Sequence, residues 1–335
     1  MNKRAAIVLA GGKGQRFQTT NGKWQDKALA ELWGKPLLVL AVESISEVVD
    51  QVIVVVNEEA RKIEYGKVLA AFDAPKVSLA TDLKINGLSG PLIAIYSGLK
   101  TVKADYYLTV PADVPMLNQK VAEYLFTKIE DSYVAVPMWP NGRLETLLMV
   151  LSRKVCFSIT DLLCHLGRSH PDDIIRGTLR TFFVSPLGDI KMLDPELKSF
   201  VNINSQQDLS LLKPRQGQGS ISANLRLNLG EPPLEEIPQL LEAFEKRGKK
   251  EFLDSSEMFA SCADRLERKE LHFWAALSRE HQAKSLPAST KQNKDAFLKA
   301  AKNYNAEAKI YDQNHCYILG GRAKSDASWC QKQIK

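Results

Sequence analysis

The sequence predicts an α/β fold, in which a Rossmann-like, mostly parallel sheet flanked by helices is followed by an all-α helical domain. Through residues 1–212, short apolar runs rich in β-branched residues alternate with helical patterns, which is typical of parallel sheets covered on both faces. Fourteen of the fifteen prolines lie at or before Pro238. Beyond that point, apolar residues recur at helical spacing almost to the end of the chain, which favours helices.

The elements of the first region follow from their apolar patterns and their flanking turn residues. The predicted strands cover residues 5–9, 51–56, 76–79, 106–110, 133–137, 144–151 and 181–184. The predicted helices cover residues 36–48, 58–72, 91–102, 119–129 and 153–166. Ligands of such sheets bind beyond the carboxyl ends of the strands, so residues that directly follow a strand are the first candidates for a site.

Two domains are the default for a chain of 335 residues. We expect an α/β domain over residues 1–212, a linker over 213–230 that contains the polar stretch KPRQGQGS, and a helical domain over 231–335. The segment 259–283 loosely mirrors 298–323. This similarity suggests tetratricopeptide-like hairpins, although a plain bundle of helices explains it equally well.

Composition excludes several classes of function. The net charge of +6 is spread over both regions, which argues against nucleic acid as a partner because backbone binding needs clustered cations. The apolar run near the N-terminus is about six residues long, too short for a signal peptide or a membrane span. The five cysteines form no CxxC pair, so we expect reduced, buried thiols and a cytoplasmic location.

The stretch AAIVLAGGKGQRF holds the strongest functional signal. Its strand ends at Leu9, Ala10, Gly11 and Gly12, where glycines let the backbone approach a ligand and expose N–H groups. Arg16 and Lys27 follow in the same loop, and two cations beside exposed N–H groups suit a triphosphate. A purely structural glycine turn and a solvated lysine are the alternatives.

Three further clusters follow other strands or precede a helix. Asp82 stands before a glycine turn that leads to Pro91, where a helix start could bind an anion or could simply be capped. Asp113, held between two prolines in VPADVP, offers the hard oxygen ligands that Mg²⁺ prefers, or serves as a turn residue. Asn202 and Asn204 alternate along an extended segment and therefore share one side; they could bind a phosphate or cap the next helix.

In their order along residues 4–212, these motifs resemble the nucleotidyltransferase superfamily, and within it the molybdenum cofactor guanylyltransferases. The motifs are LAGGKGQRF, DKALAELWGKPLL, the Asp82 region, PADVP and VNINSQQDL. The resemblance implies backbone contacts from residues 9–12 to a guanine nucleotide and phosphate binding by Lys27. It further places Asn57 and Asp82 in the nucleotide pocket, Mg²⁺ on Asp113, and the segment 139–145 near the acceptor. The remaining implied contacts come from Asn202 and Asn204, which would complete the metal and phosphate environment.

The expected reaction is nucleotidyl transfer. A phosphate of the acceptor, molybdopterin on the resemblance, attacks the α-phosphorus of GTP and pyrophosphate leaves, while Arg16, Lys27 and Mg²⁺ on Asp113 stabilise the charge. Alternatives within this class are GMP transfer to adenosylcobinamide phosphate or phospholactate, CMP transfer to a molybdenum cofactor, and transfer to a sugar phosphate. A nucleotide-sensing adaptor, whose helical domain binds a protein partner, is an alternative of another class.

Overall fold

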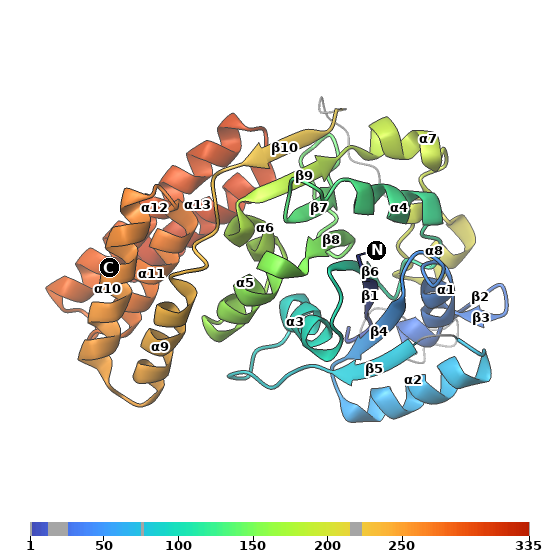
Figure 1. Ribbon diagram of the computed structural model, residues 1–335, viewed down its shortest axis with the longest axis horizontal. Helices are drawn as coiled ribbons and strands as arrows, with labels where there is room; N and C mark the ends of the chain where they lie inside the picture. The colour runs from blue at the N-terminus through green and yellow to red at the C-terminus, as the bar shows by residue number, and fades with distance from the viewer. Residues whose placement is uncertain (1, 13–25, 75–76, 215–222, 335) are drawn as a thin grey trace.

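The computed structural model describes residues 2–12, 26–74, 77–214 and 223–334. Its main sheet has eight strands in the order β10-β9-β7-β8-β6-β1-β4-β5, and a two-stranded ribbon pairs β2 with β3 (Figure 1). The strands are β1 Arg4–Leu9, β2 Glu31–Leu32, β3 Lys35–Pro36, β4 Gln51–Val56, β5 Val77–Thr81, β6 Tyr106–Pro111, β7 Val134–Pro137, β8 Met149–Ser152, β9 Arg180–Val184 and β10 Leu225–Asn228.

The predicted mostly parallel sheet is confirmed. β1 pairs in parallel with both β4 and β6, and β4 pairs in parallel with β5. The exceptions are β8, which runs antiparallel to β6 and β7, and β10, which runs antiparallel to β9. Because β1, β4, β5 and β6 point the same way, their carboxyl ends meet at one edge of the sheet.

Helices cover both faces of the sheet, as the continuous burial of Ala5 to Val8 in β1 requires. Ala5 and Ile7 face a core formed with α3, α5 and α6, whereas Ala6 and Val8 face a core formed with α1, α2 and α4. The helices of this region are α1 Leu37–Glu43, α2 Glu59–Ala71, α3 Pro91–Thr101, α4 Gln119–Thr127, α5 Arg153–His165, α6 Asp172–Thr178, α7 Lys191–Leu193 and α8 Gln206–Leu211.

The C-terminal region is helical, as predicted. Among the described residues it contains α9 Ile237–Gly248, α10 Phe252–Arg268, α11 His272–Lys284, α12 Lys291–Gln313 and α13 Tyr317–Lys332. Each helix packs against the next one along the chain. The helix lengths vary from 12 to 23 residues. The similarity to tetratricopeptide hairpins stays a prediction.

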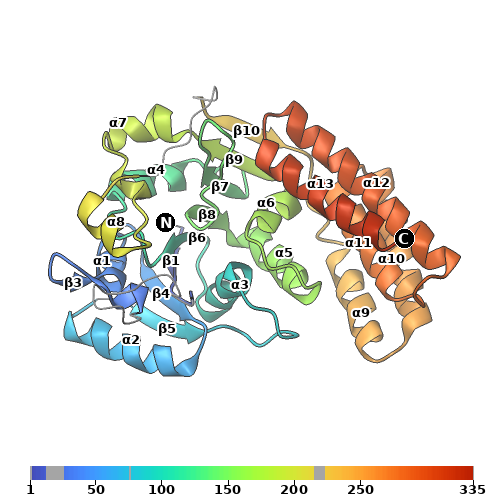
Figure 2. The ribbon, with the colours of Figure 1, turned by 180° about the vertical axis from the view of Figure 1, so that it is seen from behind.

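The C-terminal helices pack directly against helices of the α/β region. In both Figure 1 and Figure 2, α5 and α6 lie between the sheet and the C-terminal helices. Trp274 of α11 is fully buried and donates a hydrogen bond of 2.9 Å from Nε1 to the carbonyl oxygen of Gly177 in α6. A Cβ atom on Gly177 would lie 2.9 Å from the Trp274 ring, so only glycine permits this contact.

The structure differs from the predicted elements at several places, and the short elements β2, β3 and α7 had no predicted counterpart. Residues 225–228 form the edge strand β10 inside the predicted linker, of which residues 215–222 lie outside the described part of the chain. The predicted strand over 144–151 begins only at Met149, because the preceding residues form a loop. The helix predicted over 36–48 ends at Glu43, and α6 had no predicted counterpart.

All five cysteines are buried and free of disulfides, as expected. Among the described residues, no helix is both long enough and apolar enough to cross a bilayer. The cytoplasmic location remains a prediction.

Candidate active site

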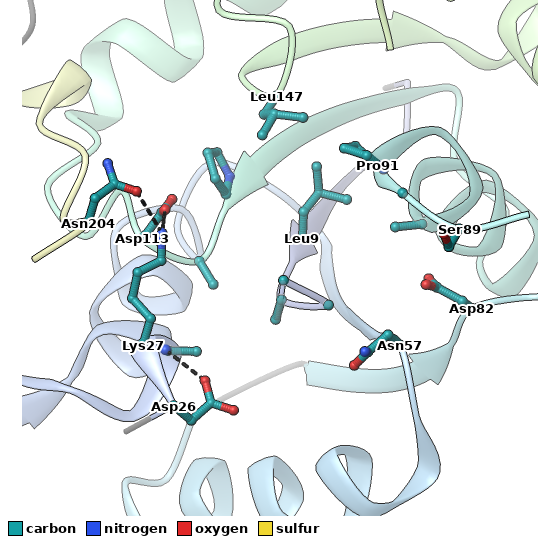
Figure 3. A pocket seen from close by; sticks show the side chains of 18 residues that line it. Leu9, Asp26, Lys27, Asn57, Asp82, Ser89, Pro91, Asp113, Leu147 and Asn204 are labelled. Carbon is teal, nitrogen blue, oxygen red and sulfur yellow. Dashed lines mark hydrogen bonds and ion pairs between the residues drawn. The ribbon is translucent and has the colours of Figure 1, made fainter. Parts of the chain in front are cut away.

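A cavity of about 520 Å³ opens at the carboxyl edge of the parallel strands. Its walls come from the ends of β1, β4, β5 and β6, from the start of α3, and from three further segments that carry residues 26–28, Leu147 and Asn204 (Figure 3). The residues that line it are Leu9, Ala10, Gly11, Gly12, Asp26, Lys27, Ala28, Asn57, Asp82, Ser89, Gly90, Pro91, Ala94, Pro111, Ala112, Asp113, Leu147 and Asn204.

Backbone hydrogen bonds hold the strand ends together around the cavity. The amide of Ala10 donates to the carbonyl of Val55 at 2.9 Å, and the amide of Asp82 donates to the carbonyl of Val56 at 2.8 Å. Gly11 lies directly against Asn57, since a Cβ on Gly11 would lie 3.2 Å from the Asn57 amide nitrogen. A Cβ at this position would require the backbone at Asn57 to shift by a few tenths of an ångström, so the close approach favours glycine.

Lys27, Asp113 and Asn204 converge at one end of the cavity (Figure 3). The Lys27 ammonium forms an ion pair with Oδ2 of Asp113 and donates a hydrogen bond of 3.0 Å to Oδ1 of Asn204. The Lys27 side chain is 24% exposed and that of Asp113 is 13% exposed. These residues are far apart in sequence, so only the fold brings the cation and the carboxylate together.

Asp113 retains an atom suited to a cation. Its Oδ1 is buried and accepts no hydrogen bond from the described residues. Those residues contain no group of three or more His, Cys, Asp or Glu side chains that could bind a metal by themselves. The site therefore fits a divalent cation that takes one carboxylate from the protein and its remaining ligands from phosphate oxygens and water.

Asn202 lies outside the lining of the cavity, whereas the sequence suggests that it contacts the ligand. It shares a side with Asn204, as predicted, and its Oδ1 accepts a hydrogen bond of 3.2 Å from Nδ2 of Asn204. Asn204 lines the cavity, whereas Asn202 does not. Asn202 thus orients the amide of Asn204 so that Oδ1 of Asn204 points to Lys27.

Asp82 and Asn57 lie at the opposite end of the cavity from Asp113, with Ser89 and Pro91 beside Asp82 (Figure 3). Burial raises the pKa of Asp82 to about 6. Its Oδ1 is buried and has no hydrogen-bond partner among the described residues. A partly buried carboxylate without a partner is costly to the fold and is typical of a ligand site.

The Asp82→Asn variant is expected to raise the free energy of unfolding at pH 7 by about 1 kcal/mol, after allowance for partial exposure. Because the pKa of Asp82 is raised in the folded state, its carboxylate destabilises the fold increasingly as the pH rises from about 4 to 6. The gain should therefore vanish below pH 4. Thermal melts of the wild type and the Asp82→Asn variant from pH 4 to 7 measure this gain in stability. A difference in stability that does not change with pH would contradict this account.

Arg16 was predicted to be catalytic, but it lies outside the described residues. The 139–145 segment, expected near the acceptor, forms a loop in which Glu145 accepts hydrogen bonds from Nε1 of Trp139 and, at 3.0 Å, from Arg143. Leu147, just after this segment, reaches the cavity. The other predicted residues, namely Leu9, Ala10, Gly11, Gly12, Lys27, Asn57, Asp82, Asp113 and Asn204, all line it.

Sequence reasoning missed a group on α2 that supports the site. Arg61 donates a hydrogen bond of 2.6 Å to the carbonyl of Gly12, and its Nε lies 3.4 Å from Oδ2 of Asp26. Tyr65, fully buried, donates to the same oxygen of Asp26 at 2.8 Å. Oδ1 of Asp26 in turn accepts from the amide of Ala28, which caps the 3₁₀ turn that carries Lys27.

The Arg61→Met variant is expected to lower kcat/KM for the nucleotidyl transfer expected from the sequence about tenfold. The substitution removes two charge-assisted contacts that hold Gly12 and Asp26. Lys62→Met is the matched control, because Lys62 is the next residue on α2 and its ammonium, among the described residues, forms a surface ion pair with Glu59. Steady-state kinetics of both variants test this role. Equal losses in the two would show that Arg61 acts only through general helix stability.

The fold and the cavity define an α/β nucleotide-binding domain with its ligand site at the carboxyl ends of parallel strands. A family model described as the MobA-like NTP transferase domain matches residues 6–180. The chain belongs to this family. The predicted membership and enzyme class, a nucleotidyltransferase, are thereby confirmed.

Individual relatives agree with the family match. The chain is 31% identical over 207 residues to a probable molybdenum cofactor guanylyltransferase of Methanosarcina acetivorans, covering 62% of this chain and 88% of the relative. It is 28% identical over 225 residues to a molybdenum cofactor guanylyltransferase of Desulfosudis oleivorans, covering 66% of this chain and all of the relative.

A solved structure supports the fold. Molybdopterin-guanine dinucleotide biosynthesis protein A from Archaeoglobus fulgidus has a TM-score of 0.50 and 22% identity, and the match covers 63% of this chain and 96% of that one. At this identity the likeness supports the α/β fold only.

Proposed function

We propose that the protein transfers GMP from GTP to a phosphorylated acceptor, the molybdopterin cofactor, and releases pyrophosphate. The observation that carries the proposal is the convergence of Lys27, Asp113 and Asn204 at one end of a cavity lined by strand-end backbone. The choice of GTP and molybdopterin is supported by the names of the relatives, molybdenum cofactor guanylyltransferases.

The two ends of the cavity suit the two parts of a nucleotide. The ammonium of Lys27 offers charge for the triphosphate, whereas Asp82 and Asn57 offer oxygen and amide groups for the nucleoside (Figure 3). The unpartnered Oδ1 of Asp82 can accept a hydrogen bond from a ribose hydroxyl or a purine N–H group. A guanine nucleotide would therefore lie along the cavity, with its phosphates beside Lys27.

Phosphoryl chemistry of this kind needs charge stabilisation more than proton transfer. The acceptor phosphate, with a second pKa near 6, is ionised at neutral pH. Its oxygen forms a bond to the α-phosphorus of GTP as the bond from that phosphorus to the bridging oxygen breaks, and the electron pair leaves with pyrophosphate. Lys27 stabilises the negative charge that this exchange concentrates on the phosphate oxygens.

Asp113 is the residue that would hold Mg²⁺, through the oxygen that lacks a partner among the described residues. When bound, the cation supplies charge neutralisation along the triphosphate. Lys27 would then donate to oxygens of the substrate instead of Asp113, while its hydrogen bond to Oδ1 of Asn204 holds the ammonium in the cavity. Asn202, behind Asn204, keeps the amide oriented for this exchange.

Pyrophosphate release tests the proposal. The full-length protein with Mg²⁺ is incubated with each of GTP, CTP, ATP and UTP and with molybdopterin, molybdenum cofactor, adenosylcobinamide phosphate, phospholactate or a sugar phosphate. We expect release with GTP and the molybdopterin acceptor. Release with another pair would keep the reaction class and replace the substrates, and no release with any pair would overturn the proposal.

A further inference from the structure

We propose that the C-terminal helices position the nucleoside end of the active site through a buried network of arginines and carboxylates, here called the arginine network: Arg168, Asp173, Arg176, Glu307 and Asp326. The kinetic part of this inference rests on the proposed nucleotidyl transfer. The family model ends at residue 180, so Glu307 and Asp326 contribute from beyond the matched domain.

Arg176 of α6 is the centre of the network and is fully buried. Its Nε and Nη2 atoms each donate a hydrogen bond of 2.8 Å to the carboxylate of Glu307 in α12. Its Nη1 atom donates to Asp326 in α13 at 2.7 Å and to Asp173 at 2.9 Å. A buried guanidinium satisfied by three fixed carboxylates specifies one arrangement of α6, α12 and α13.

Arg168 lies in the loop between α5 and α6 and connects that loop to this arrangement of helices. It donates two hydrogen bonds of 2.9 Å, from Nε and Nη2, to Asp173, and Nη2 also donates at 2.9 Å to Oδ2 of Asp326. That same oxygen of Asp326 accepts from Arg176. The carboxylates keep the pKa of both arginines high against the opposing effect of burial. Asp326 therefore joins the two arginines from a helix outside the α/β domain.

The residue after Arg168 touches the cavity wall. The carbonyl oxygen of Ser169 accepts a hydrogen bond of 3.4 Å from the amide of Leu92 in the first turn of α3. A Cβ on Gly90 would lie 3.5 Å from the same oxygen. Gly90 has a φ of +118°, which favours glycine, and it lines the cavity together with Pro91. The loop at Ser169 thus supports the start of α3 at the nucleoside end.

A second contact between the helices and the rim of the site is independent of the arginines. Gly142 lies against the start of α13, since a Cβ there would be 3.8 Å from both Cγ1 of Ile318 and the amide nitrogen of Tyr317. Gly142 belongs to the loop that leads to the cavity residue Leu147. The C-terminal helices therefore contact two separate loops. The loop at Ser169 contacts the cavity residue Gly90, and the loop at Gly142 leads to the cavity residue Leu147.

Asp326→Asn tests the coupling, and Asp264→Asn is its matched control. Asp326→Asn removes one carboxylate from Arg168 and Arg176, each of which keeps Asp173. Asp264→Asn likewise removes one carboxylate from the nearly buried Arg279, which keeps Glu267. The Asp264 pair lies wholly within α10 and α11. We expect Asp326→Asn to raise the KM for GTP about threefold to tenfold with kcat within twofold of wild type, and Asp264→Asn to leave the KM for GTP unchanged.

Hydrogen exchange provides a readout that needs no substrate. In Asp326→Asn, and in Arg168→Lys, which loses the fork geometry to Asp173, the amides of residues 90–95 should exchange faster than in the wild type, with no such change in Asp264→Asn. Unchanged exchange in both network variants, or equal changes in the control, would overturn the inference. If the wild type releases no pyrophosphate with any nucleotide, the proposed function fails while the exchange data still decide this inference.

Discussion

The Asp113→Asn variant is expected to lower kcat on the order of 10³-fold. Oδ1 of Asp113 is buried and unpartnered among the described residues, and Oδ2 pairs with Lys27. An amide keeps the shape of the side chain but loses the charge that we propose holds a divalent cation. Steady-state pyrophosphate release at saturating GTP measures the effect.

Asp131→Asn is the control for this substitution, because Asp131 forms an exposed ion pair with Arg226 and should leave kcat unchanged. The fold of Asp113→Asn should survive, since Lys27 retains its hydrogen bond to Asn204. Wild-type turnover by a folded Asp113→Asn protein would show that Asp113 does not hold the cation.

The Lys27→Met variant is expected to lower kcat/KM for GTP by about 10²- to 10³-fold. Methionine retains much of the apolar stem of Lys27 and removes the ammonium that faces Asp113 and Asn204. The loss should fall on both KM and kcat, because the charge attracts the triphosphate and stabilises the transition state. Initial rates over a range of GTP concentrations separate the two parts.

Lys35→Met provides the matched control in the neighbouring β3. Lys35 pairs with Glu43 at the surface and does not line the cavity. If Lys35→Met lost as much activity as Lys27→Met, the effect would reflect the general charge of this region. If neither variant lost activity, the phosphate-binding role of Lys27 would be refuted.

The sequence predicted the sheet and most of the site because both depend on local patterns. Runs such as residues 52–56 are apolar throughout, as buried parallel strands require. Gly11, Asn57, Asp82 and Asp113 directly follow strands, so the shared direction of those strands was enough to predict that they gather in one cavity. Lys27 was selected as a cation in the loop after the glycines, but only the fold shows that it pairs with Asp113.

The features that escaped prediction depend on distant partners. The sequence of α6, DDIIRGT, looks too polar for a buried helix. Its burial depends on partners elsewhere in the chain, among them Glu307 and Asp326, which lie 131 and 150 residues from Arg176. β10 forms because β9 offers it an open edge, whereas its flanking sequence resembles a linker. Arg61 reaches Gly12 across 49 residues, and nothing near it in the sequence signals this contact.

The central claim is that one cavity holds a purine nucleoside triphosphate lengthwise between Asp82 and Lys27. A crystal structure of the protein with Mg²⁺ and a non-hydrolysable GTP analogue tests it most directly. The account predicts phosphates beside Lys27 with the cation on Asp113, and the purine ring at the Asp82 and Asn57 end. A nucleotide bound elsewhere, or one with its phosphates beside Asp82, would contradict it.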